Sequence, residues 1–488
     1  MTELKRISTK VVYDAHPFAR EILARLQDAG FEAVLIGGVV RDGLQAQMQR
    51  DVLFPPKDVD IATAALPEEI RGTFDDRTII GVGEEFGVLV IVAPDGRTYE
   101  VASFRVESEY DGRWPGKVDL VRDLESDVRR RDLTVNGLAA TVDGEVIDLV
   151  GGTKDLVARR VATIGDPVVR FSEDYLRMMR VVRFACLIDG DVDEAAAQAV
   201  RDHADAIQKI SSERIGDEML RILETPRAAR GLELLDALGL LSYILPELSN
   251  CHGAPQPEEY HPEGDVFAHT AEAVRVADGF IRDPIVKLAV VLHDIGKPIA
   301  LARNDGRNMG GHCSMGSRMA KEIGRRLRLS KQQTQRLSFL VRHHMRIADF
   351  PKMGRGKQIR FLSEGEAQQA STLSARYPLF RDLLQVLVAD CEATAHRSAG
   401  WAPILQETIQ VMDHIERVCG LQRVRRIIDG HDLTNLGLRP GPRLGRILNH
   451  VHDRILAGHI ATREDAVAFA QSLIDEESLL PDENHGRN

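Results

Sequence analysis

The stretch FEAVLIGGVVRD, residues 31–42, decides how the first part of the chain folds. Its apolar, β-branched run predicts a strand, and Gly37-Gly38 predicts a tight turn that leads into a helix. Further apolar runs predict more strands of the same small sheet: VLVIVA (88–93), TYEVASF (98–104) and EVIDLV (145–150). We therefore expect an α/β or α+β region over about the first 150 residues.

The pattern changes after about residue 174. Apolar positions then recur at helical spacing, with few Gly or Pro, through about residue 245. The Pro- and Gly-rich interval 252–265 predicts a domain boundary, and further helical blocks follow it. Because 488 residues are too many for one hydrophobic core, the sequence predicts an α+β multidomain protein, with a small mixed sheet followed by mostly helical domains.

Charge, hydropathy and cysteine usage indicate which classes of protein this chain is expected to belong to. The net charge of 63 − 74 = −11 by itself disfavours a nucleic-acid partner, but arginines concentrate at 129–131, 159–160 and 170–183, so a basic face is expected. No run of about 18 apolar residues and no signal-peptide core is present, which predicts a cytoplasmic protein without a membrane partner. Five scattered cysteines without a CxxC pair disfavour a disulfide framework and a zinc ribbon.

An acidic pair follows the glycine turn along the chain. In Asp58-Val59-Asp60 the alternate residues of a strand share a face, so both carboxylates are expected to project together. Such a pair suits Mg²⁺. Two-metal phosphoryl transfer needs a third carboxylate, and Glu100 is the candidate if the sheet brings it near the pair. The alternative for the pair alone is a solvated charge patch in a surface loop.

Gly38 and Arg41 add a phosphate-binding element. A glycine turn at a helix N-terminus offers backbone N–H groups, and the arginine adds a cation for a triphosphate. Together these features resemble the bacterial and eukaryotic type of tRNA nucleotidyltransferase and the bacterial poly(A) polymerases. The resemblance covers nearly the whole chain, in six motifs that follow the family's order: LIGGVVRD (35–42), KDVDIAT (57–63), YEVASFR (99–105), RRRDLTVNGLA (129–139), IDLVGGTKDL (147–156) and EDYLRMMRVVRF (173–184).

The resemblance implies a role for each matching residue. Asp58 and Asp60 are expected to hold the catalytic Mg²⁺ ions, with Glu100 as the third catalytic carboxylate. The nucleotide-binding residues would be Gly38, Arg41, Arg131, Asp174, Arg177, Arg180 and Arg183. Within this set Asp174 and Arg177 would read the Watson–Crick edges of CTP and ATP, since Asp only accepts hydrogen bonds and Arg presents a rigid fork of donors. A salt-bridged helix face is the alternative for Arg180 and Arg183.

Residues 104–121 match the family's flexible loop at full length. Enzymes that add only CC tend to have a shortened loop here, so that specialisation is disfavoured. Full CCA addition, addition of the terminal A alone and poly(A) synthesis remain open.

A second set of metal-ligating residues lies in the helical block after residue 251. Imidazoles and carboxylates spread over several helices are what a divalent-metal hydrolase site in a helical bundle needs. The ordered series resembles the HD phosphohydrolase superfamily in its two-metal variant: His269, His293, Asp294, His312, His343, His344 and Asp390. The resemblance implies Mn²⁺, Ni²⁺, Fe²⁺ or Mg²⁺ at this site, and phosphate esters of RNA ends as substrates. Lys297 is a candidate phosphate contact or a solvated lysine.

The motifs together predict four domains: a nucleotidyltransferase head at 1–165, a helical neck at 166–250, an HD domain at 251–400 and a helical RNA-binding region at 401–488. The predicted function is addition of CCA, or of its terminal A, to tRNA 3′ ends from CTP and ATP. The alternatives are poly(A) synthesis on general RNA, a chain that acts chiefly as an HD phosphohydrolase on RNA ends, and a non-catalytic RNA-binding module. The oligomeric state stays open.

Overall fold

The computed structural model describes most of the chain, and its contacts divide the chain into two compact units. The first comprises Met1–Ser249 with Arg326–Leu329, and the second comprises Asn250–Arg325 with Ser330–Asn488. The described residues are 5–48, 58–81, 83–110, 112, 115–259, 261–262, 264–364, 377–394, 398–418 and 427–478. The expected α+β multidomain fold is confirmed, whereas the division into four domains stays a prediction.

The sheet of the first unit carries the acidic residues singled out above. Among the described residues its strands lie in the order β3-β4-β5-β2-β1-β8-β9. β2 and β5 run parallel and the other neighbours antiparallel, so the sheet is mixed. The strands are β1 (Ala33–Ile36), β2 (Asp60–Thr63), β3 (Ile79–Ile80), β4 (Val88–Val92), β5 (Thr98–Ser103), β8 (Leu138–Ala140) and β9 (Val146–Asp148).

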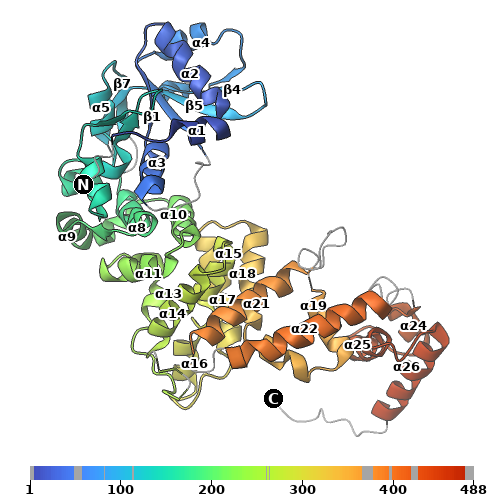
Figure 1. The fold of residues 1–488 in the computed structure, drawn as a ribbon. Helices are drawn as coiled ribbons and strands as arrows, with labels where there is room; N and C mark the ends of the chain where they lie inside the picture. The colour runs from blue at the N-terminus through green and yellow to red at the C-terminus, as the bar shows by residue number, and fades with distance from the viewer. Residues whose placement is uncertain are drawn as a thin grey trace. The chain divides into compact units, whose positions relative to one another are not determined.

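The predicted strand, turn and helix at 31–42 lie at the centre of this unit. All four residues of β1 are buried, Gly37 turns the chain with a φ of 75°, and α3 (Gly38–Met48) begins directly after it. α2 (Pro17–Asp28) buries Ile22 and Leu26, four residues apart on one face, and packs on β1 and β2 (Figure 1). The other helical segments of this region are α1 (Thr9–Ala15), α4 (Pro67–Thr73), α5 (Leu124–Arg129), α6 (Gly152–Val157), η1 (Glu84–Phe86) and η2 (Thr134–Asn136).

The segment that matches the flexible loop of the family forms a hairpin. Its strands, β6 (Arg105–Tyr110) and β7 (Pro115–Leu120), pair antiparallel from Arg105 opposite Leu120 to Tyr110 opposite Pro115. A second small pair, β10 (Arg160–Val161) and β11 (Asp191–Val192), runs parallel.

The remainder of the first unit is helical, as predicted. α8 (Arg177–Ile188) buries one face, including Met178, Val181 and Val182, and packs against α10 and α11. The elements are α7 (Pro167–Glu173), α9 (Glu194–Asp202), η3 (Ala204–Lys209), α10 (Ser212–Glu224), α11 (Ala228–Ala237), α12 (Leu241–Ile244) and α13 (Pro246–Ser249).

The second unit consists of helices in its described part, around a core of α14, α15, α18 and α21. None of the described helices is long and apolar enough to cross a membrane. The helices are α14 (Val266–Asp278), α15 (Pro284–Leu292), α16 (Lys297–Arg303), α17 (His312–Arg326), α18 (Lys331–His343), η4 (Arg346–Lys352), α19 (Arg355–Leu362), α21 (Pro378–Glu392), α22 (Ser398–Val418), α24 (Gly430–Asn435), α25 (Pro442–Leu456) and α26 (Arg463–Ser478).

Candidate functional site

Three carboxylates meet at the start of β2. Asp60 is the first residue of that strand, and the parallel register sets it directly opposite Glu100 of β5. Asp58 lies two residues before Asp60, and the Val59 between them is buried. All three carboxylate residues are exposed. The alternation along the strand and the strand pairing therefore bring the three predicted carboxylates to one edge of the sheet.

The Asp60 carboxylate lies in a crowded electrostatic environment. Surrounding protein atoms displace water from it and raise its pKa, and Asp58 raises it further, while Arg131 and Arg41 act in the opposite direction. A divalent cation would stabilise two neighbouring carboxylates in their charged form. The acidic oxygen donors at this position therefore fit Mg²⁺, which prefers carboxylate oxygen and leaves room for substrate phosphates.

The glycine turn lies beside an arginine and a carboxylate. A Cβ added at Gly37 would lie 3.6 Å from Arg131 Nη1 and 3.9 Å from Asp60 Oδ2. Arg131 is oriented by a hydrogen bond from its Nη2 to Asp127 Oδ2 at 3.1 Å. Arg41 is only 7% exposed and donates from Nη1 to Asn136 Oδ1 at 2.7 Å. Both guanidinium groups are thus fixed beside the acidic edge.

These residues line a cavity of about 520 Å³. A nucleoside triphosphate needs a cleft of this size with a few fixed charged groups. Most of the predicted site residues meet in its wall, namely Gly38, Arg41, Asp60, Arg131, Asp174, Arg177, Arg180 and Arg183. The structure therefore gathers around one pocket the glycine turn, Asp60 at the start of β2, and the arginine stripe of α8, formed by Arg177, Arg180 and Arg183. Glu100 pairs with Asp60 in the sheet.

Each arginine of the stripe has a carboxylate partner. Arg177 pairs with Glu173, Arg180 Nε donates to Asp132 Oδ2 at 2.6 Å, and Arg183 Nε donates to Glu218 Oε1 at 2.6 Å. Because an arginine has five N–H donors, these bonds leave others for the cavity. The salt-bridged helix face considered for two of these arginines is thus present, and the same residues still line the pocket.

Asp174 is held by Arg214, a residue that the sequence reasoning did not single out. Arg214 lies on α10 and donates from Nη1 and Nη2 to the two carboxylate oxygens, at 3.2 and 2.6 Å. This two-point contact fixes the plane of the carboxylate at the wall of the cavity. The only sequence signal for Arg214 is its place on an amphipathic helix, which says nothing about its partner.

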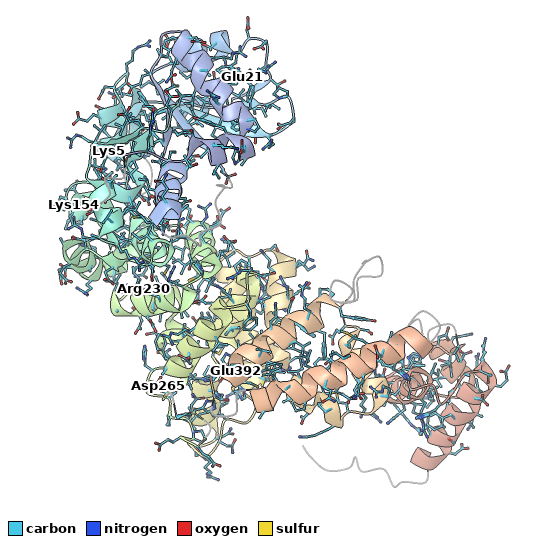
Figure 2. The ribbon with its side chains drawn as sticks, viewed as in Figure 1. Lys5, Glu21, Lys154, Arg230, Asp265 and Glu392 are labelled. Atoms are coloured by element: carbon cyan, nitrogen blue, oxygen red, sulfur yellow. The ribbon has the colours of Figure 1, made fainter. Side chains whose placement is uncertain are left out.

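In the second unit four predicted ligands meet at the ends of three helices. His269 comes from α14, His293 and Asp294 follow α15, and Asp390 lies in α21. His269 Nε2 is 3.2 Å from His293 Nε2 and 3.1 Å from Asp390 Oδ1, and His293 Nε2 is 3.2 Å from Asp294 Oδ2. Asp265 caps α14 one turn before His269 (Figure 2). We call this group the first donor set.

A second donor set uses the other oxygen of Asp294. His312 Nε2 and His344 Nε2 lie 3.4 and 3.5 Å from Asp294 Oδ1, and 3.4 Å from each other. His269, His293, Asp294 and His344 are all at most 2% exposed. Asp294 is therefore positioned to bridge two metal ions, one on each of its oxygens.

Hydrogen bonds to the backbone orient three of these imidazoles. His293 Nδ1 is 2.7 Å from Val290 O, His312 Nδ1 is 2.9 Å from Met309 O, and His344 Nδ1 is 2.9 Å from Val341 O. Since a carbonyl only accepts, each Nδ1 carries a hydrogen, and each Nε2 is the atom that would bind a metal ion after giving up any proton it holds.

The charges of the cluster also fit a cation. Burial alone would raise the pKa of Asp294 and of Asp390, but His293 and the other imidazoles around them, with Lys297 beside Asp294, hold both pKa values well below the usual range. Burial alone would lower the pKa of His293, yet Asp294 and Asp390 raise it to about 10. Both carboxylates stay ionised, as metal ligands must be.

The structure does not bring His343 into either donor set. Its ring packs between Phe339 and Phe361, with centroids 4.6 and 5.7 Å away. Neighbouring residues of a helix point about 100° apart, so only one of His343 and His344 can face the cluster. The prediction of His343 as a metal ligand therefore needs correction, whereas Lys297, whose Nζ is 2.5 Å from Asp294 Oδ2, lies at the cluster.

Cys313 joins this cluster although the sequence reasoning did not single it out. Its Sγ lies 3.4 Å from His312 Nε2, and it forms with His312 and His344 a group whose donor atoms all lie within 4.8 Å of one another. The only signal for Cys313 in the sequence was its position next to His312. Because the cysteines are scattered along the chain, their spacing did not suggest a metal ligand.

Comparison with known families and proteins now adds to this geometry. A model described as the poly A polymerase head domain matches residues 33–162, and a model described as the probable RNA and SrmB-binding site of polymerase A matches residues 191–251. The CCA-adding enzyme of Geobacillus sp. (strain WCH70) is 43% identical over 224 residues, which are 46% of this chain and 53% of the relative. Residues 33–162 and 191–251 are thus similar to the head domain of poly A polymerase and to an RNA-binding site of polymerase A.

A second curated relative and a solved structure are also similar to this chain. The CCA-adding enzyme of Limosilactobacillus reuteri (strain DSM 20016) is 40% identical over 237 residues, which are 48% of this chain and 56% of the relative. The chain thus spans about half the length of the curated relatives it matches. The structure of the Bacillus stearothermophilus CCA-adding enzyme in complex with CTP is 25% identical, has a TM-score of 0.66, and covers 95% of this chain and 98% of that one.

Proposed function

We propose that the first unit adds nucleotides to RNA 3′ ends, and that its reaction is the addition of CCA, or of the terminal A, to tRNA from CTP and ATP. The parallel register of Asp60 with Glu100 beside Asp58 carries this proposal, because it brings three carboxylates together and one of them, Asp60, lines an arginine-rich cavity. Relatives named CCA-adding enzymes support it.

In the proposed reaction the RNA 3′-hydroxyl attacks the α-phosphate of the nucleotide. A bond forms between the 3′ oxygen and the α-phosphorus, the bond to the β-phosphate breaks, pyrophosphate leaves, and the hydroxyl proton passes to solvent. Asp58, Asp60 and Glu100 would hold Mg²⁺, which when bound would supply charge neutralisation at the phosphates. Arg41 and Arg131 bind and orient the triphosphate beside this edge, so positioning contributes much of the rate.

The choice of base is proposed to rest on Asp174 and Arg177. The Asp174 carboxylate accepts hydrogen bonds from a base, and Arg177 donates them, both from the wall of the cavity. Their partners Arg214 and Glu173 hold the two groups in fixed orientations. A rigid pair of this kind can distinguish bases without a nucleic-acid template, because a mismatched base leaves a donor or acceptor unpaired.

Extension of tRNA transcripts tests this function. Transcripts that end before the tail, after C or after CC are incubated with CTP and ATP, separately and together. We expect either growth of the bare transcript to CCA and no further, or addition of one A to the CC-ended transcript alone. Long A tails without use of CTP would instead identify a poly(A) polymerase, and no extension of any transcript would contradict the proposal.

We propose a second, hydrolytic function for the second unit, in which two divalent metal ions act on a phosphate ester at an RNA end. The observation that favours it is Asp294, whose two oxygens face two separate sets of imidazoles. The ions proposed here are Mn²⁺, Ni²⁺, Fe²⁺ or Mg²⁺, and when bound they would supply an activated water. Lys297 holds the shared carboxylate in place.

Hydrolysis of 2′,3′-cyclic AMP and of RNA ending in a 2′,3′-cyclic phosphate, assayed with each metal in turn, tests the second function. We expect activity that Asp294→Asn abolishes and that Asp60→Asn leaves intact. Activity lost in Asp60→Asn but kept in Asp294→Asn would assign the hydrolysis elsewhere in the chain.

A further inference from the structure

The second donor set contains four different donor atoms. Beside Asp294 Oδ1, His312 Nε2 and His344 Nε2 stands the sulfur of Cys313, 3.4 Å from His312 Nε2. Cys313 and His312 are neighbours in the first turn of α17, so one short segment supplies two donors. The set therefore offers one oxygen, two nitrogens and one sulfur.

The spacing of these atoms suits tetrahedral coordination. With bonds of about 2.0–2.3 Å, two ligands of a tetrahedral zinc ion lie roughly 3.3–3.7 Å apart, whereas neighbouring ligands of an octahedral ion at about 2.1 Å lie about 3.0 Å apart. Four of the six donor–donor distances in the second set are 3.4, 3.4, 3.4 and 3.5 Å, within the tetrahedral range. Those of the first set are less uniform and run from 3.1 to 3.9 Å.

The two sets also differ in chemistry. The first, with His269, His293, Asp294 and Asp390, contains only nitrogen and oxygen, which suit octahedral ions. The second adds a thiol, and a thiolate ligand favours zinc over magnesium or manganese. The imidazoles of His312 and His344 are already fixed by their Nδ1 hydrogen bonds, so the Nε2 atoms are in position before an ion arrives.

We propose that Cys313 is a metal ligand, and that with His312, His344 and Asp294 it forms a closed tetrahedral site for a thiophilic divalent ion, zinc in the first place. The inference rests on the proposed two-metal centre and deepens it. Four protein donors complete a tetrahedral shell, whereas four donors leave two positions of an octahedral shell open. The ion of the first donor set would therefore be the one open to water and to a phosphate ester. The ion of the second donor set would hold the shared Asp294 in place.

Cobalt substitution of the full-length chain tests this assignment. Metal is removed with a chelator and Co²⁺ is added, and we expect a near-ultraviolet thiolate-to-cobalt charge-transfer band together with the strong visible bands of a tetrahedral ion. In Cys313→Ser the charge-transfer band should disappear, and the zinc affinity of one of the two positions should fall by about 100-fold. Cys391→Ser is the matched control, because Cys391 is also half-buried and also follows a predicted ligand, Asp390. It should keep the band.

The outcomes separate this inference from the function on which it rests. Cobalt bound without a charge-transfer band, or a band that survives in Cys313→Ser, would overturn the role of Cys313 and leave the two-metal centre standing. No metal bound to the wild-type chain at either position would overturn both. A measurement without any variant completes the test: zinc should protect Cys313 from alkylation, read by peptide mass spectrometry, and equal alkylation with and without zinc would contradict the proposal.

Discussion

The two candidate metal sites of this chain differ in how many of the metal ligands the protein itself supplies. In the first unit Asp58, Asp60 and Glu100 are exposed, at the start of β2 and opposite it on β5, and Asp60 lines an open cavity. In the second unit His293 and Asp294 are at most 2% exposed, and the protein supplies four donors to each donor set, with Asp294 shared between the sets. An exposed edge with few ligands leaves coordination positions for substrate phosphates. A buried cluster is ready before the substrate arrives, so it holds its ions independently of turnover.

The largest effect is expected for Asp60→Asn. It should lower nucleotide addition on the order of 10³-fold, because it removes several kcal/mol of charge stabilisation at the phosphates. The pKa of Asp60 is raised, so the folded state disfavours its charge, and the neutral Asn should not lower thermal stability. Initial rates of CTP and ATP incorporation measure the effect, with the exposed Asp75→Asn as the control. A fall of less than tenfold would remove Asp60 from the site.

The next largest effect is expected on metal binding, when Asp294, the carboxylate shared by the two donor sets, is changed. Asp294→Asn should weaken metal binding at both positions by more than about 100-fold, whereas His269→Ala should affect the first position alone. Metal content after dialysis, read by mass spectrometry, distinguishes the two. Asp305→Asn is the matched control, because this exposed aspartate lies in the same helical unit and touches no donor. Loss of a single ion in Asp294→Asn would show that the two donor sets do not share this residue.

A smaller effect is expected at Arg214. Arg214→Lys keeps the charge but cannot make the two-point contact with Asp174, so the preference for CTP and ATP over other nucleotides should relax about tenfold, equivalent to roughly 1.4 kcal/mol. The maximal rate with the preferred nucleotide should fall less than the selectivity. Competition between nucleotides on one transcript measures this, with Arg201→Lys on α9 as control. Unchanged selectivity would mean that Asp174 needs no such support.

The smallest effect is expected for His343, the residue at the end of α18 that the structure does not place in either donor set. His343→Phe should leave metal content unchanged, since the ring lies between Phe339 and Phe361, whereas His344→Phe should release the ion of the second donor set. The neighbouring variants share the same change of side chain, so each is the control of the other. Loss of metal from His343→Phe alone would reverse the placement of the two rings.

Local sequence signals predicted the parts of the site that local structure determines. The run at 31–42 predicted a strand, a glycine turn and a helix, because each follows from neighbouring residues. Alternation along β2 set Asp58 and Asp60 on a common side, with Val59 buried between them. These features need no knowledge of distant contacts.

Residues that depend on packing were harder to predict. Glu100 could only be a candidate, because alternation does not say that β5 pairs with β2 in a parallel register. The partner of Asp174 comes from another helix, so Arg214 had no signal of its own. The phase of a helix decides between His343 and His344, and the first turn of α17 decides whether Cys313 faces the donors. None of these can be obtained from spacing alone.

Two of the imidazoles described above also serve the ends of their own helices. α15 ends at Leu292 and α18 at His343, and the residue after each one donates its Nδ1–H to a carbonyl of the last turn, Val290 and Val341. Such terminal carbonyls otherwise lack intrahelical partners. An ion that fixes each Nε2 thereby secures both helix ends against fraying. Removal of the ions should therefore speed hydrogen exchange in the last turns of α15 and α18.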